Sequence, residues 1–153
     1  MKLIIYDATR KKSLLDEGWG IGALWSWLWH GSDGVLGALD WEEAIDWACN
    51  RGVYKKIDVV YYWGHGYPGN ALLDGSGLAT HFGTGGLVEN LGKYMSKDGL
   101  FWLRTCSSFH GENGKEFAKW FAETIGCRVA AHTRKIGFPF HSGLHSLRPG
   151  EEP

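Results

Sequence analysis

Two apolar stretches, Val59–Gly66 (VVYYWGHG) and Leu100–Ser108 (LFWLRTCSS), set the architecture of this chain. Each begins as a continuous apolar and aromatic run of strand length, which is typical of a strand buried on both faces of a parallel sheet. The first run stops at His65 and the second at Cys106. Because ligands of open parallel sheets bind at the carboxyl ends of the strands, we expect these two side chains to face one crevice.

The rest of the chain supplies the helices and strands that such a sheet needs. Trp41–Asn50 is predicted to be helical, since Asp40 can cap it and Glu43 completes a capping box. Gly114–Ile125 is predicted to be helical because its apolar residues repeat at helical spacing. The other predicted elements are strands at Lys2–Tyr6, Ile57–Trp63, Leu100–Thr105 and Arg128–Ala131, and a helix at Leu87–Met95. Helices between strands imply right-handed crossovers, so we predict an α/β fold with a mostly parallel sheet.

Three segments give weaker signals. Ser13–Leu28 has partly helical apolar spacing, but its glycines weaken a helix prediction. The Gly-rich segment after Trp63 is predicted to be a long loop, a length typical of functional segments. Residues 134–153 are expected to form an irregular tail with a short hairpin. We expect one domain over residues 1–153, with its core at about 2–133.

Composition excludes several classes of protein. The chain has 153 residues, of which 44% are hydrophobic and 22% charged, which fits a single compact domain. The net charge of -1 provides no electrostatic footprint for nucleic acid. We find neither a signal-like leader nor an apolar run long enough for a membrane span. With three cysteines at least one thiol is free, so a reducing, cytoplasmic setting is expected, although export without a cleaved signal stays open.

The Trp cluster at Trp19, Trp25, Trp27 and Trp29 has two interpretations. Large aromatic side chains dominate protein interiors, so core packing is the first expectation. The alternative is an apolar surface that meets a partner protein or a second copy of the chain.

His65 and Cys106 have the chemistry of a hydrolytic dyad. A histidine beside a cysteine promotes the thiolate that attacks a carbonyl carbon, and later protonates the leaving amine. Gly66 has no Cβ, so its backbone N–H can approach substrate closely and form an oxyanion hole with the Cys106 N–H. No cofactor is needed. Cys49 and Cys127 are expected to be small buried hydrophobic residues instead.

The residues at these two strand ends carry a family resemblance. An apolar block ending in His-Gly (Tyr61–Gly66), then a block ending in a small residue and Cys (Leu103–Ser107), is similar to the caspase-like cysteine peptidases. That group includes caspases, metacaspases, clostripain, gingipains, separase and CHAT domains. The 41-residue separation (106 minus 65), the Gly-led helix from Gly114 and the V-A-A-x-T strand at Val129–Thr133 also resemble it. The resemblance covers Lys2–Thr133 and implies a three-layer α/β/α sandwich acting as an endopeptidase on protein or peptide substrates.

The sequence also departs from that family. The caspase motif Gln-Ala-Cys is absent, and Arg104 stands where metacaspases have Asp, two residues before the cysteine. In the family this position contributes to the pocket for the residue before the cut, so the resemblance implies that Arg104 selects an acidic side chain. Asp7 is the alternative selector, for a basic side chain, or it pairs with Arg104. A strand-end arginine paired on the surface is equally compatible with the sequence. The chain is short for the family, so substrate binding could require a partner or a dimer.

Other hypotheses remain open at this point. His141 and His145 have the spacing of a helical metal pair, but Pro139 argues against a helix there and no third ligand is near, so no metal is expected. A catalytically silent caspase-like module would bind partners through the Trp cluster. A hydrolase acting on other bonds, or a binder of a small molecule, would use the same crevice.

Overall fold

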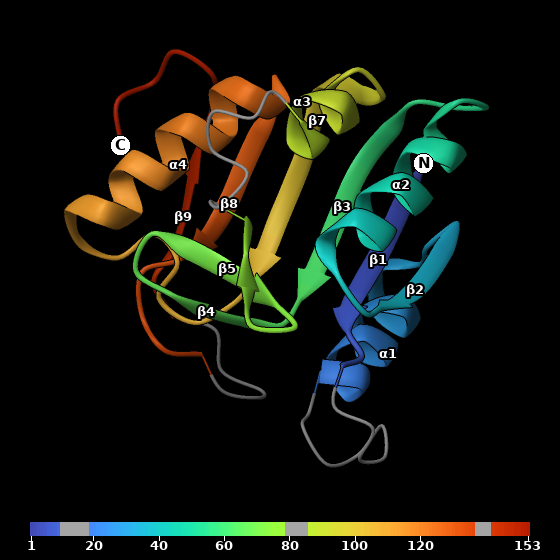
Figure 1. Ribbon diagram of the computed structural model, residues 1–153, viewed down its shortest axis with the longest axis horizontal. Helices are drawn as coiled ribbons and strands as arrows, with labels where there is room; N and C mark the ends of the chain where they lie inside the picture. Colours follow the sequence, from blue (N-terminus) through green and yellow to red (C-terminus); the bar gives the residue numbers. More distant parts are fainter. Residues whose placement is uncertain (10–18, 79–85, 137–141) are drawn as a thin grey trace.

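The structure, a computed structural model, describes residues 1–9, 19–78, 86–136 and 142–153 (Figure 1). Along the chain the elements are β1 (Lys2–Asp7), α1 (Trp19–His30), β2 (Gly34–Ala38), α2 (Trp41–Gly52), β3 (Ile57–Trp63), β4 (His65–Tyr67), β5 (Asn70–Leu73), β6 (Ser76–Gly77), α3 (Leu87–Gly92), β7 (Met95–Arg104), α4 (Gly111–Ile125), β8 (Arg128–His132) and β9 (Leu144–Leu147).

Six of these strands form one sheet in the order β2-β1-β3-β7-β8-β9. The four pairs from β2 to β8 are parallel, and only β9 runs antiparallel to its neighbour β8. The short strands β4, β5 and β6 form a second, antiparallel sheet that lies beyond the carboxyl ends of β3 and β7 (Figure 1). The predicted α/β class with a mostly parallel sheet is therefore confirmed.

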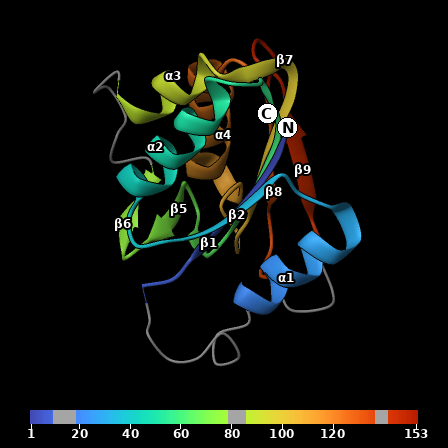
Figure 2. The ribbon, with the colours of Figure 1, turned by 90° about the vertical axis from the view of Figure 1, so that its right-hand side faces the viewer.

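Helices cover both faces of the large sheet (Figure 2). Alternation along the strands sends Leu3, Tyr62 and Leu103 to the face that α2, α3 and α4 cover, where the main core lies. It sends Ile4 and Tyr61 to the opposite face, where a smaller core includes Ala23 of α1. The layers are thus helix, sheet and helix, with three helices on one face and α1 on the other.

Local sequence signals account for most element boundaries. Asp40 accepts a hydrogen bond from the Glu43 N–H (2.7 Å) at the start of α2, as the capping box predicts, while the Glu43 carboxylate accepts from the Leu39 N–H (2.8 Å). The helix expected at Leu87–Met95 ends earlier, at Gly92. Beyond it the Tyr94 carbonyl accepts from the Ile57 N–H (3.0 Å), so pairing with β3 draws this segment into β7.

The structure corrects two further expectations and adds one strand. The segment after Trp63, expected to be a loop, forms β4, β5 and β6 between His65 and Gly77, while residues 79–85 lie outside the described part. The tail, expected to be irregular, supplies β9, whose register pairs Leu147 with Val129. Strand β2 had no clear sequence signal, because its five residues include two glycines.

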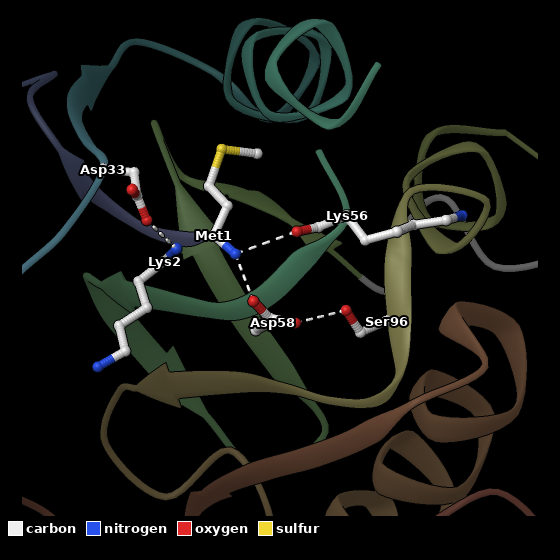
Figure 3. Close-up of polar contacts among 6 residues, drawn as sticks. All are labelled: Met1, Lys2, Asp33, Lys56, Asp58 and Ser96. Carbon is white, nitrogen blue, oxygen red and sulfur yellow. Dashed lines mark hydrogen bonds and ion pairs between the residues drawn. The ribbon is translucent and has the colours of Figure 1, made fainter. Parts of the chain in front are cut away.

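The amino ends of the strands are tied together around Asp58 (Figure 3). The Met1 amino group pairs with the Asp58 carboxylate and donates to the Lys56 carbonyl (3.1 Å). The Ser96 hydroxyl donates to the other Asp58 oxygen (2.6 Å). The hydrogen bond from the Met1 amino group, together with that from Ser96, lowers the pKa of Asp58. These contacts join β1, β3 and β7 at the end of the sheet opposite to His65 and Cys106.

Candidate functional site

The two predicted site residues follow neighbouring strands at the same level. Strands β3 and β7 are adjacent and parallel, and their last paired residues are Trp63 and Arg104. His65 and Cys106 each lie two residues beyond that pair. Figure 1 shows both strands ending side by side at the edge where β4 begins. The strand register therefore places both residues just beyond the same edge of the sheet.

Gly66 is packed against the loop that holds Cys106. A Cβ placed on Gly66 would lie 2.4 Å from the Ser108 hydroxyl oxygen and 2.8 Å from both the Cys106 carbonyl oxygen and the Thr105 Cβ. Any side chain larger than hydrogen would collide with this loop. The missing Cβ is therefore what allows the His65–Gly66 backbone to lie directly on the Cys106 loop.

Hydrogen bonds fasten the β4–β5 hairpin to the same loop. The Ser108 hydroxyl donates to the Asn70 carbonyl (2.7 Å), and the Gly69 N–H donates to the Ser108 carbonyl (3.0 Å). The Thr105 and Ser108 hydroxyl oxygens lie 2.6 Å apart. Because the single Ser108 proton is used on Asn70, Thr105 is the donor in this contact. Both hydroxyl side chains are fully buried. Each of these hydrogen bonds contributes about 1 kcal/mol to stability, and removal of one partner would cost more, because the other polar group would stay buried without a partner.

The opposite side of the loop is held by the last residue of β8 and the segment that follows it. The Ser107 N–H donates to the Arg134 carbonyl (3.0 Å), and the Phe109 N–H donates to the His132 carbonyl (3.2 Å). The Cys106 sulfur contacts the Ile136 backbone, 3.4 Å from its nitrogen and 3.7 Å from its oxygen. The thiol therefore lies against the backbone of the segment that follows β8.

Ser107 has an unusual backbone conformation. Its φ is 56°, which lies in the left-handed region of backbone conformation. Residues other than glycine adopt this region at a cost of about 1–2 kcal/mol. The contacts on both sides of the loop hold it there. Backbone strain of this kind is found preferentially at active sites and ligand clamps.

The three free thiols differ in environment. Cys106 is half-buried, whereas Cys49 and Cys127 are buried, as expected. Burial raises the pKa of Cys49 to about 11 and that of Cys127 to about 12, which leaves both as thiols at neutral pH. His65 begins β4 and is exposed.

Arg104 is buried among aromatic rings rather than on the surface. Its guanidinium carbon lies 4.1 Å from the centre of the Trp102 ring and 4.6 Å from that of Trp63. Within the described residues it has no carboxylate partner, and its Nε has no hydrogen-bond acceptor. Burial lowers the pKa of Arg104 to about 10, partly offset by Tyr61.

Asp7, the alternative selector, lies on the other face of the sheet. It follows Ile5 along β1, whereas Arg104 shares its face with Trp102. Its carboxylate accepts from the backbone N–H (3.0 Å) and the hydroxyl (2.7 Å) of Thr9. The two candidate selectors are therefore not brought together.

Sequence reasoning missed Ser26, the polar residue that connects α1 to both strand ends. The fully buried Ser26 hydroxyl oxygen accepts from the Trp63 indole N–H (3.2 Å) and from the Arg104 guanidinium (3.4 Å). Trp63 and Arg104 each stand two residues before a candidate site residue. A small polar residue between two tryptophans in an otherwise apolar helix was the available signal.

Three of the four residues of the Trp cluster are not part of the core, contrary to the first expectation. Trp25, Trp27 and Trp29 are 42%, 47% and 71% exposed, and the Trp19 side chain lies outside the described residues. Small residues of α1 face the sheet instead. Gly22 lies so close to the sheet that a Cβ on it would be 2.5 Å from the Trp63 ring. With the sheet this close, the large side chains of α1 are directed to solvent.

The remaining sequence hypotheses concern metals and membranes. His145 is exposed on β9, and His141 lies outside the described residues. Over the described ranges no three His, Cys, Asp or Glu residues are grouped as metal ligands. Nor does any helix in this part of the chain have the length and apolar character to cross a membrane.

Comparison of the chain with models of known protein families, with curated proteins and with solved structures gives no match. The class that the structure defines is an α/β protein with a mostly parallel six-stranded sheet and helices on both faces.

Proposed function

We propose that this protein is a cysteine endopeptidase of the caspase-like type, with Cys106 as nucleophile and His65 as general base and acid. The observation that carries the proposal is the β3–β7 register, because it sets His65 and Cys106 at one level beyond adjacent strands. The close approach of Gly66 to the Cys106 carbonyl adds support, since it joins the two segments directly.

The proposed reaction uses only side chains and backbone of this chain. His65 takes the Cys106 thiol proton, and the thiolate attacks the carbonyl carbon of a peptide bond. The Gly66 and Cys106 N–H groups stabilise the oxyanion of the tetrahedral intermediate. His65 returns the proton to the leaving amine, which leaves a thioester on Cys106. Water, deprotonated by His65, then hydrolyses the thioester and restores the thiol.

The rigidity of the Cys106 loop also favours catalysis over a purely structural role. The loop is hydrogen-bonded on one side to the β4–β5 hairpin and on the other to residues 132–136. Its strained Ser107 is held by these contacts. A catalytic group gains most from such fixed surroundings, because its geometry is set before substrate binds.

For the residue before the cut, Arg104 is the better supported of the two selectors. Its guanidinium is buried two residues before Cys106 with no carboxylate partner in the described part, so an acidic substrate side chain would complete it. The Asp7 carboxylate is already occupied by Thr9.

The first test is cleavage of a diverse peptide library by the native protein, read by mass spectrometry. Cys106→Ala should abolish cleavage and His65→Gln should lower kcat/KM by about 10²–10⁴-fold. Cys49→Ala, which removes a buried thiol, should leave cleavage unchanged and is the matched control. Equal cleavage by the native and Cys106→Ala proteins would exclude this dyad. Absence of cleavage by every form would favour the second candidate.

The second candidate function is a catalytically silent module that binds a partner or a second copy through α1. The exposure of Trp25, Trp27 and Trp29 favours it, since large exposed apolar patches mark interaction sites. Such a module would keep its partners and its oligomeric state in the Cys106→Ala form, and would lose them on substitution of the exposed tryptophans by glutamine. Size-exclusion chromatography with light scattering separates these outcomes.

A further inference from the structure

A cavity of about 300 Å³ lies between the β4–β5 hairpin and α4. The hairpin contributes Tyr67, Pro68 and Gly69 to its lining, and α4 contributes Asn113, Glu116 and Phe117. This hairpin begins at His65, and α4 follows the Cys106 loop. The cavity therefore adjoins the candidate site on elements that the site itself positions.

The lining suits a long cationic side chain. Pro68 and the Tyr67 ring, which is 49% exposed, provide an apolar surface for an aliphatic stem, and the buried Phe117 completes the lining. The polar lining residues are Glu116, Asn113, Asn70 and Tyr67, and the Asn70 amide donates to the Tyr67 hydroxyl (3.2 Å). Lys, Arg and His are absent from the described lining residues. A carboxylate among neutral groups favours a bound ammonium or guanidinium over an anion.

Glu116 is not neutralised by the lysines beside it on α4. Lys115 pairs with Glu112 (2.8 Å), and Lys119 pairs with Glu152 (2.7 Å). Among the described residues Glu116 has no ion-pair partner of its own. Its carboxylate is thus available to a cation that enters the cavity.

The position of the cavity defines its relation to the proposed cut. Tyr67 lies two residues after His65 in β4, and alternation places both side chains on the same side of that strand. Two residues of a strand span about 7 Å, a similar length to two residues of an extended peptide. A peptide at the dyad would therefore bring a side chain two or three residues from its scissile bond to the cavity.

We propose that this cavity is a subsite for a lysine or arginine side chain of a peptide ligand. The exposed Glu116 pairs with the cation, and Tyr67 and Pro68 contact the aliphatic stem. The position of the peptide's lysine or arginine relative to the scissile bond rests on the proposed function, whereas binding of the peptide at the cavity does not.

Fluorescence polarisation with labelled peptides tests the subsite. The peptides share a Gly/Ser/Ala background and differ at one position, which holds lysine, norleucine or glutamate. The Cys106→Ala protein serves as receptor, since it binds without turnover. Lysine peptides should bind about 2- to 5-fold more tightly than norleucine peptides, the range of an exposed ion pair. Glu116→Gln should remove that preference and leave norleucine binding unchanged, and Glu116→Lys should favour glutamate peptides.

Glu123→Gln is the matched control, because Glu123 lies two turns further along α4 and outside the cavity lining. Equal affinity for lysine and norleucine peptides, or a lysine preference that survives Glu116→Gln, would overturn the subsite. So would failure of the lysine peptides to bind. Cleavage is measured separately with the protein that keeps Cys106. A lysine preference in binding with no cleavage would contradict the proposed peptidase activity but not the subsite. Cleavage without a lysine preference in binding would contradict the subsite but not the peptidase activity.

Discussion

The two faces of the six-stranded sheet are covered in different ways. On one face α2, α3 and α4 insert large side chains such as Trp41 and Phe121 into the main core. On the other, α1 presents Gly22, Ala23 and Ser26 to the sheet and Trp25, Trp27 and Trp29 to solvent. The first face therefore carries most of the stabilising burial, while the second carries polar contacts that reach the candidate site. An apolar sequence does not by itself indicate which side chains of a helix are buried.

The sharpest test of this difference uses the same substitution on both faces. Leu91 of α3 is 1% exposed and Leu28 of α1 is 63% exposed. Leu91→Ala should lower the free energy of unfolding by about 2–5 kcal/mol, because it leaves a cavity in the main core. Leu28→Ala should change it by less than about 0.5 kcal/mol. Urea denaturation of both variants measures the contrast, and similar losses would mean that α1 is covered in solution.

A smaller effect is expected from the polar contacts beneath α1. Ser26→Ala removes the acceptor of two buried donors, on Trp63 and Arg104, and should cost about 1–3 kcal/mol. The cost should fall when Arg104 is already methionine, because one orphaned donor is then absent. A double-mutant cycle in urea measures this coupling. Additive losses would show that Ser26 and Arg104 do not interact.

The smallest expected effect is a pH dependence from His132 on the α1 face. Burial lowers the pKa of His132, with a further contribution from Arg104 and opposition from the Ser142 carbonyl. The folded protein then binds fewer protons than the unfolded chain, so stability rises with pH and is lost as pH falls below about 6.5. His132→Asn should reduce the difference between urea midpoints at pH 5.5 and 7.5. An unchanged difference would assign it to other groups, such as His30, whose pKa burial also lowers.

Several features were predictable because their causes are local. The α2 capping box depends on Asp40 and Glu43, three residues apart, and the β3 and β7 runs are recognisable from continuous apolar sequence. The assignment of Cys49 and Cys127 to the core needed only their place in α2 and directly before β8. The end of α3 and the pairing of β9 were not predictable in this way, because each depends on a partner strand distant in sequence.

By itself, the sequence determined the α/β class and the positions of His65 and Cys106 just beyond two buried strands, because hydrophobic periodicity and capping act within a few residues. Tertiary structure alone decided that β3 and β7 are neighbours in a register that aligns those residues. It also decided that Gly66 lies against the Cys106 loop, that Arg104 is enclosed by aromatic rings, and that Trp25, Trp27 and Trp29 face solvent. These features depend on contacts between segments far apart in the chain, and no local preference specifies which segments meet.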